Sequence, residues 1–132
     1  MNSNVNVNYE KVYTDDVGKT LVNFNKSNVS LKSMWEGAID AFYQNEFSNK
    51  FICLHGDIRV VVAMDEGNNN YKFNQYFLSG LDGKVITIEP ETWYGVHNLG
   101  QTRCVILNKI PDVRQPTEKR LSSKIFNWHA KR

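Results

Sequence analysis

Four side chains have types and spacing that can do chemistry together. Tyr43 and Asn45 stand two residues apart, Asn49 follows four positions later, and Tyr94 lies in a separate segment. Since residues i and i+2 of a strand point to the same face, Tyr43 and Asn45 are expected to enter one site. A phenol has a pKa near ~10, so Tyr43 needs a nearby cation or several donors to act as a base near neutral pH. Neutral Tyr and Asn are poor ligands for Zn, Fe or Mn, and we therefore predict neither a transition metal nor another cofactor.

Four more residues are candidates for the same site, and each also has a structural interpretation. His97 follows Tyr94 closely and can face a pocket as an acid or base, or lie elsewhere. Trp93 can stack on a nucleobase or a sugar, or pack as a core aromatic. Arg59 and Arg103 stand in strand-like runs, where they can bind a phosphate or lie as exposed charges. The two tyrosines can likewise simply fill the interior.

The elements that must position these side chains are strands. Apolar runs recur at 51–54, 58–64, 72–78, 85–88 and 103–107, with turn signals between them. No segment shows a convincing helical period, and Ser33 to Gln44 is also expected to be a strand. Because open sheet edges must be paired or covered, such strands are expected to close on themselves. We predict an all-β fold, a single jelly-roll barrel.

Composition excludes several classes of protein. The 132 residues fit one domain, and sixteen basic against fourteen acidic side chains are too balanced for a dedicated nucleic-acid binder. No apolar run is long enough to span a membrane, and the polar first ten residues do not resemble a signal peptide, so we expect a cytoplasmic protein. Cys53 and Cys104 lie in apolar runs and are expected to be reduced core residues.

Glycine-framed spacing in two segments resembles the paired motifs of the cupin superfamily. The family patterns are G-x5-H-x-H-x3-E-x6-G and G-x5-P-x-G-x2-H-x3-N. The chain has Gly37-x5-Tyr43-x-Asn45-x3-Asn49-x6-Gly56 and Gly83-x5-Glu89-x-Glu91-x2-Tyr94-x3-Asn98. The resemblance implies that positions 43, 45, 49 and 94 converge inside one barrel, where metal-binding cupins carry three histidines and a glutamate.

Further segments resemble one branch of this superfamily, the RmlC-like proteins and among them the short members of the dTDP-4-dehydrorhamnose 3,5-epimerase family. Residues 88–95 (I-E-P-E-T-W-Y-G) are similar to the family's I-P-P-G-x-W-[YH]-G, and residues 56–62 are similar to G-x-I-x-V-V-L. Residues 119–128 are similar to the family ending E-x-R-L…I-P-Y-D-W. The resemblance implies one cupin domain over residues 1–132, with an N-terminal arm of strands (1–30) and a C-terminal tail (117–132).

The same resemblance implies a function, a ligand and an oligomeric state. Members of this family act on nucleotide-linked deoxysugars for surface polysaccharide, as dimers and without metal. By analogy, a base takes the proton beside the C4 ketone of a dTDP-4-keto-6-deoxysugar, Asn45 and Asn49 stabilise the enolate, and Tyr43 or Tyr94 returns a proton. His97 is a further catalytic candidate, and Arg59, Trp93 and Arg103 are candidates for substrate binding.

Three departures from the family pattern leave two main functions open, besides a general small-molecule cupin unrelated to sugars. Tyr43 stands where the family has its catalytic histidine, and Asp40 stands where it has an arginine for the diphosphate. Val113 and Arg114 occupy the segment where the family has its proton-donating tyrosine. The first hypothesis is a nucleotide-sugar epimerase or isomerase. The second is a non-catalytic cupin that binds a sugar nucleotide or a partner enzyme.

Overall fold

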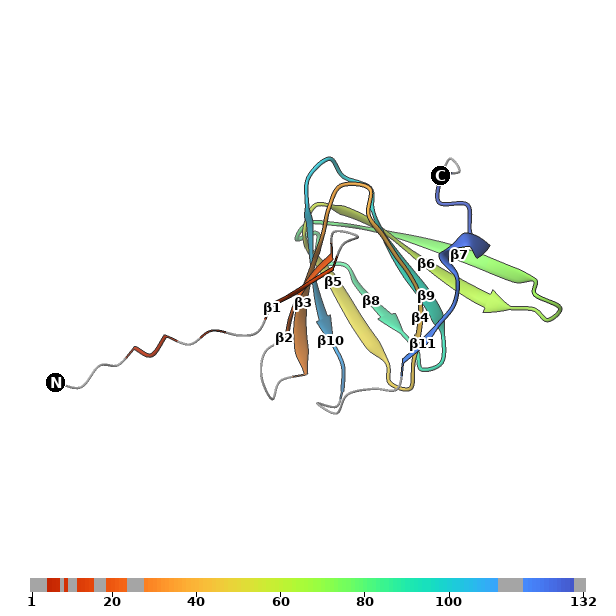
Figure 1. Ribbon diagram of the computed structural model, residues 1–132, viewed down its shortest axis with the longest axis horizontal. Helices are drawn as coiled ribbons and strands as arrows, with labels where there is room; N and C mark the ends of the chain where they lie inside the picture. The colour runs from red at the N-terminus through yellow and green to blue at the C-terminus, as the bar shows by residue number, and fades with distance from the viewer. Residues whose placement is uncertain are drawn as a thin grey trace.

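The strands form two antiparallel sheets that face each other, which confirms the predicted jelly roll (Figure 1). The computed structural model describes residues 5–7, 9, 12–15, 19–23, 28–111 and 118–129. Sheet A contains, in spatial order, β1 (Val12–Thr14), β2 (Lys19–Asn23), β3 (Val29–Met34), β10 (Cys104–Lys109), β5 (Asn49–His55) and β8 (Val85–Ile88). Sheet B contains β11 (Glu118–Arg120), β4 (Ile39–Asn45), β9 (Trp93–Asn98), β6 (Asp57–Asp65) and β7 (Tyr71–Ser79). The described residues include a short 3-10 helix, η1 (Ser123–Ile125), and none of their helices is long and apolar enough to cross a membrane.

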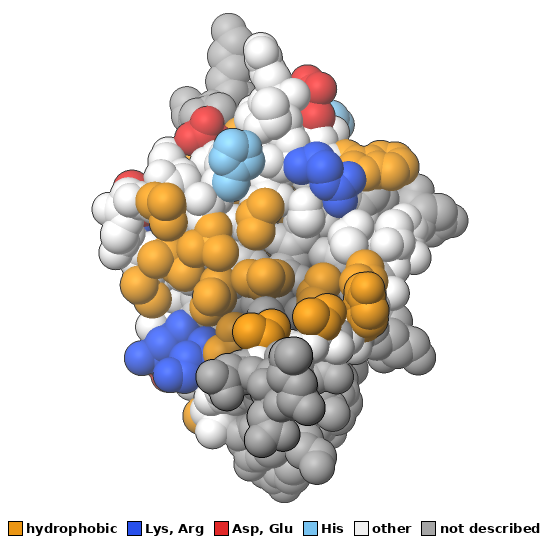
Figure 2. Space-filling model, turned by 90° about the vertical axis from the view of Figure 1, so that its left-hand side faces the viewer, with side chains coloured by type: hydrophobic (Ala, Val, Ile, Leu, Met, Phe, Trp, Pro, Cys, Tyr) orange, Lys and Arg blue, Asp and Glu red, His pale blue; other side chains and the backbone are white. Residues whose placement is uncertain are grey.

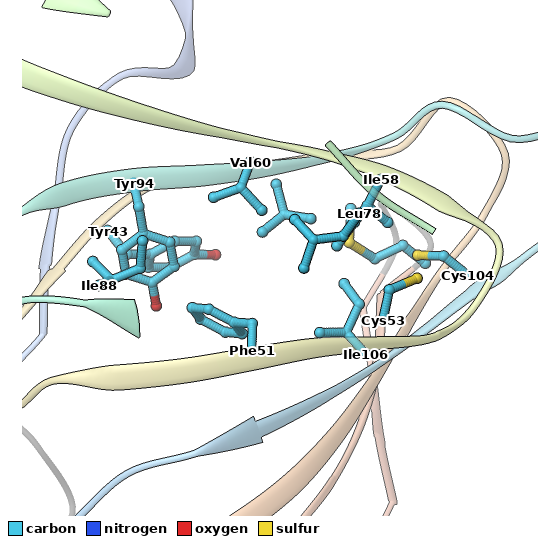
Figure 3. Close-up of a cluster of buried hydrophobic side chains, with 12 residues drawn as sticks. Tyr43, Phe51, Cys53, Ile58, Val60, Leu78, Ile88, Tyr94, Cys104 and Ile106 are labelled. Atoms are coloured by element: carbon cyan, nitrogen blue, oxygen red, sulfur yellow. The ribbon is translucent and has the colours of Figure 1, made fainter. Parts of the chain in front are cut away.

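The main core lies between the two sheets. Alternate residues of each strand point inward, and their apolar side chains form one buried cluster. Its members are Met34, Tyr43, Phe51, Cys53, Ile58, Val60, Leu78, Ile88, Tyr94, Val96, Cys104 and Ile106. Figure 3 shows the two tyrosines side by side at one end of this cluster and the two cysteines at the other. Both cysteines are buried free thiols, as predicted.

A second apolar cluster covers the outer face of sheet B. Phe42, Val61 and Ala63 project outward from this sheet and pack against Trp128. The C-terminal segment that covers them begins with β11, which pairs antiparallel with β4. The chain then continues through η1 to Trp128, only 7% exposed. The segment expected as a tail is therefore, over its described part 118–129, a structural layer of the protein.

The structure divides the segment Ser33 to Gln44, which we predicted as one strand. β3 ends at Met34 and β4 begins at Ile39, and a turn lies between them. Gly37 in this turn has a φ of +74°, a conformation that glycine adopts without strain. The apolar residues that suggested a continuous strand belong to β4 alone. The break allows the chain to pass from sheet A to sheet B.

Gly95 provides a test of the packing between sheet B and the C-terminal segment. A methyl group at this position would overlap the Cβ of Ala41 and lie 3.2 Å from the Trp128 ring. We predict that Gly95→Ala lowers the free energy of unfolding by about 1–3 kcal/mol, because the crowded backbone and ring must move. Urea denaturation followed by tryptophan fluorescence measures the change.

Gly100→Ala is the matched control. An added Cβ there meets its nearest atoms at 3.6 Å, an ordinary contact distance. Equal destabilisation by the two substitutions would show that crowding at Gly95 is not the cause.

Candidate functional site

Three of the four predicted motif residues are in contact inside the barrel. Tyr43 pairs with Tyr94 across β4 and β9, and the centroids of their rings lie 6.1 Å apart. The side-chain nitrogen of Asn45 lies 3.5 Å from the Tyr94 hydroxyl. All three side chains are at most 7% exposed. The polar atoms of these residues thus meet at one end of the apolar core.

Asn49 reaches the same side of the barrel from sheet A. It begins β5, two residues before Phe51, whose ring centroid lies 5.4 Å from that of Tyr94. The Asn49 side chain donates to the carbonyl of Phe47 over 3.3 Å and accepts from Asn108 over 3.4 Å. The four motif positions therefore contribute to one end of the interior, as the spacing predicted.

An irregularity in β4 sets the direction of these side chains. The pairing of β4 with β9 shifts register between Asp40 and Tyr43. Within this shift, Ala41 and Phe42 both pack against the outer cluster. Bulges of this kind re-aim side chains near functional sites. As a result Asp40 and Tyr43, three positions apart, are both buried and joined by a hydrogen bond.

Asp40 is the centre of a charged group that links the two sheets. Its carboxylate accepts a hydrogen bond from the Tyr43 hydroxyl and forms ion pairs with Lys32 at 3.1 Å and Lys19 at 3.3 Å. The Lys19 ammonium also lies 3.3 Å from the Tyr43 oxygen. The Arg120 guanidinium of β11 lies 4.1 Å from the centroid of the Tyr43 ring. The carboxylate that stands where the family has an arginine for the diphosphate is therefore matched by two lysines.

These surroundings determine which groups carry charge. Burial alone would raise the pKa of Asp40, but Lys32, Lys19 and the hydrogen bond from Tyr43 lower it below the ordinary value of 3.8. Burial, followed by the nearby Asp40 charge, raises the pKa of Tyr43 far above 10. Burial also raises the pKa of Tyr94. At neutral pH both phenols are protonated and Asp40 is ionised.

The residues at the motif positions do not fit a transition metal. Two protonated phenols and two amides replace the imidazole and carboxylate donors that such ions prefer. The described part of the chain has no group of three His, Cys, Asp or Glu residues arranged to hold a metal. No metal-dependent step is therefore assigned to this site.

His97, Arg59 and Trp93 lie on the opposite face of sheet B. The Arg59 guanidinium is almost fully buried and donates to His97 Nδ1 over 2.7 Å and to the Trp128 carbonyl. Its other terminal nitrogen donates to Gln75 over 3.2 Å. Trp93 packs against the outer cluster. The structure thus does not bring these three residues together with the tyrosines, because their positions alternate with Tyr94 along the paired strands.

Arg103 is separated from both groups. It is exposed, and its guanidinium donates to Ser33 and Thr20, each over 3.1 Å. These partners belong to β3 and β2 of sheet A. Val113 and Arg114, which replace the family's tyrosine segment, lie outside the described residues.

The structure adds Lys19, Lys32 and Arg120 to the site, which the sequence motifs did not include. Lys32 lies two residues before the buried Met34 on β3 and therefore shares its inward face. That alternation was a usable signal. Lys19 reaches the site because β2 pairs with β3, and Arg120 reaches it because β11 pairs with β4. Neither pairing can be read from the spacing of residues in the sequence.

Comparisons with known proteins support the cupin fold. The chain matches no protein-family profile and no curated protein sequence. It resembles the capsular polysaccharide assembling protein CapF from Staphylococcus aureus, with a TM-score of 0.72 and 21% identity over 86% of this chain. The match spans only 34% of CapF, about a third of its length. The cupin domain of Drosophila melanogaster CENP-C matches with a TM-score of 0.62 and 16% identity, over 76% of this chain and 74% of that one.

A third similar structure shows how little this fold alone says about activity. Oxalate oxidase, solved with the substrate analogue glycolate, gives a TM-score of 0.60 and 11% identity over 80% of this chain and 47% of its own. An oxidase, a polysaccharide assembly protein and CENP-C thus contain the same architecture. Function must be argued from the site.

The charges around Asp40 predict an acid-dependent loss of stability. A carboxyl whose pKa is lowered by folding stabilises the protein above its unfolded value, and this contribution disappears as pH falls through the folded pKa. We predict that the free energy of unfolding of Asp40→Asn varies less than that of the wild type below about pH 4. Urea denaturation at a series of pH values measures this slope.

Tyr43→Phe is the graded control for this experiment. It removes one hydrogen bond to Asp40 but keeps both lysines. The free energy of unfolding of this variant should vary with pH less steeply than that of the wild type and more steeply than that of Asp40→Asn. If the free energy of unfolding of Asp40→Asn varied with pH as steeply as that of the wild type, the acid dependence would not come from this carboxyl.

Proposed function

We propose that the chain is an RmlC-like, non-catalytic cupin that binds a nucleotide-linked 4-keto-6-deoxysugar in surface polysaccharide biosynthesis. The sugar class is supported by the epimerase-like segments of the sequence and by the likeness to CapF, a capsular polysaccharide assembling protein. The buried free thiols of Cys53 and Cys104 support a cytoplasmic location, where such thiols stay reduced.

The polar end of the barrel supplies the groups that such a ligand needs. Lys19 and Lys32 keep their side chains 24% and 12% exposed, and Arg120 is exposed beside them. The ion pairs with the two lysines already offset the negative charge of Asp40. This charge therefore does not prevent the cations from contacting a diphosphate. The side-chain oxygen of Asn45 is buried and has no hydrogen-bond partner among the described residues. A buried acceptor without a partner costs about 1–3 kcal/mol, which a ligand hydroxyl can recover.

The hydrogen bond from Tyr43 to Asp40 is the observation that favours binding over catalysis. To act as a base, Tyr43 must first lose its proton, and Asp40 is its direct acceptor. The ordinary pKa values of the two groups, 10.0 and 3.8, already differ by about six units, or roughly 8 kcal/mol. The surroundings shift the two pKa values further apart. Proton abstraction by this phenol is therefore strongly disfavoured.

An epimerase is the second candidate function, and one contact favours it. Lys19 lies 3.3 Å from the Tyr43 oxygen, where an ammonium would stabilise a phenolate. In that mechanism the phenolate would take the proton beside the ketone, and a phenol such as Tyr94 would return one. The two candidates differ in whether the bound sugar exchanges hydrogen with water.

Binding in D2O distinguishes the two functions. We predict that dTDP-4-keto-6-deoxyglucose produces measurable heat in isothermal titration calorimetry and ligand signals in saturation-transfer NMR. We also predict that mass spectrometry detects no deuterium at C3 or C5 above the rate without protein. Deuterium incorporation would establish the epimerase instead, and absence of binding would overturn both functions.

Arg120 and Lys119 provide a matched pair of variants on β11. Arg120 pairs with Tyr43 and lies over its ring, whereas Lys119 pairs with Gln44 on the alternate face. We predict that Arg120→Gln weakens binding of the dTDP-sugar roughly tenfold, the effect of about 1.4 kcal/mol, because a phosphate contact is lost. Lys119→Gln should leave the affinity unchanged. Equal affinities of the two variants would place the phosphate elsewhere.

A further inference from the structure

An apolar row crosses the outer face of sheet A from edge to edge. Each of the six strands contributes one residue, and successive residues are partners in the strand pairing, so the row is about 24 Å long. None of the six is buried, and Val12 and Val85 at the two ends are 57% and 55% exposed. The row consists of Val12, Val22, Leu31, Leu107, Ile52 and Val85.

The two sheets differ in how their outer faces are covered. On sheet B, the chain's own C-terminal segment packs Trp128 and Phe126 against the outward-facing apolar side chains. On sheet A, the corresponding residues remain partly exposed in the described structure. An ordered apolar row of this kind costs free energy in water unless another surface covers it.

Basic side chains lie on both sides of the apolar row. On one side, the exposed Lys50 and Lys109 are direct partners on β5 and β10. Like charges opposite each other destabilise a sheet, so this pair favours an anionic neighbour. On the other side, the exposed Arg103 guanidinium donates to Thr20 and Ser33, which are partners on β2 and β3. Figure 2 views this face and shows hydrophobic side chains across its middle, with Lys or Arg on two opposite sides of them.

Acidic residues are confined to the other sheet. None of the residues in the six strands of sheet A is Asp or Glu. The strands of sheet B, in contrast, contain Asp40, Asp57, Asp65 and Glu118. In Figure 2 the acidic side chains appear only towards the rim of the face. The strands of sheet A thus present an outer face that is apolar in the middle and positively charged beside it.

We propose that the outer face of sheet A binds the surface of a membrane that contains anionic lipids. The apolar row enters the headgroup region, and Lys50, Lys109 and Arg103 contact the lipid phosphates. Attachment of this kind combines burial of apolar side chains with attraction between basic side chains and anionic lipids. The protein then lies on the membrane surface, and no segment needs to span the bilayer.

The composition of this face favours a membrane over a protein partner. The centres of protein–protein interfaces are enriched in aromatic residues, and lysine is depleted there. The row contains only Val, Leu and Ile, and its paired neighbours Lys50 and Lys109 are lysines. A protein partner needs acidic groups at matching positions, whereas an anionic bilayer offers phosphates all around a face that lies on it.

Co-sedimentation of the full chain with lipid vesicles tests the proposal. We expect the wild type to pellet with vesicles of equal parts phosphatidylglycerol and phosphatidylcholine, and to stay in the supernatant with phosphatidylcholine alone. Each lysine near an anionic surface strengthens binding roughly fivefold, so Lys50→Glu/Lys109→Glu should lower the partition coefficient at least about tenfold. The matched control Lys72→Glu/Lys119→Glu makes the same change in charge at exposed positions of sheet B. It should bind nearly as tightly as the wild type, because salt screens distant charges.

The apolar row is tested by substitutions that leave the net charge unchanged. Val12→Asn and Val85→Asn remove apolar contact at its two exposed ends. Each should weaken binding to the anionic vesicles severalfold, because less apolar surface enters the headgroup region. Unchanged binding in both variants would show that the row does not enter the membrane and would overturn the proposal.

The remaining outcomes are equally distinct. No sugar nucleotide is present, so a failure here leaves the proposed ligand-binding function untouched. Circular dichroism establishes that each variant is folded before its binding is compared. A wild type that binds neither kind of vesicle overturns the proposal, including the case in which a second copy or another protein occupies this face. Equal loss of binding in the two double variants also overturns it, because the attraction then comes from the net charge of the molecule.

Discussion

The buried carboxylate of Asp40 joins the two sheets from the inside. It belongs to β4 of sheet B, and its two cationic partners belong to β2 and β3 of sheet A. A buried charge is tolerated only when it is paired and hydrogen-bonded, so Lys19, Lys32 and Tyr43 are tied to this position. The same requirement fixes the hydroxyl of Tyr43 and keeps its proton in place. One electrostatic constraint therefore links the two sheets on this side, orients the Tyr43 hydroxyl and makes Tyr43 a poor base.

The fold could be predicted because its signals are local. Apolar runs between turn residues indicated strands, and the glycine spacing placed Tyr43, Asn45 and Tyr94 on strands that converge. The site could be predicted only in part, because Lys19 and Arg120 reach it through pairings between distant segments. His97 was assigned to the site because it follows Tyr94 closely, and Arg59 because it stands in a strand-like run. A single step along a strand reverses the face, and both residues lie outside the barrel interior.

The comparison with similar structures separates what the architecture determines from what the side chains determine. The same jelly roll occurs in CapF, in CENP-C and in oxalate oxidase. In this chain the barrel end holds phenols and amides whose protons stay in place at neutral pH. Recognition of hydroxyl and phosphate groups is compatible with such an end, whereas proton transfer requires a more easily ionised group.

The Arg59 side chain has a consequence for how the protein is made. Its guanidinium is buried beneath Trp128 and donates to the carbonyl of that residue. Before the segment that contains Trp128 has been made and docked, the middle of sheet B faces water with this cation and the Phe42 ring uncovered. The outer layer of sheet B therefore forms only once Trp128 is in place, and until then this face presents an apolar surface to water.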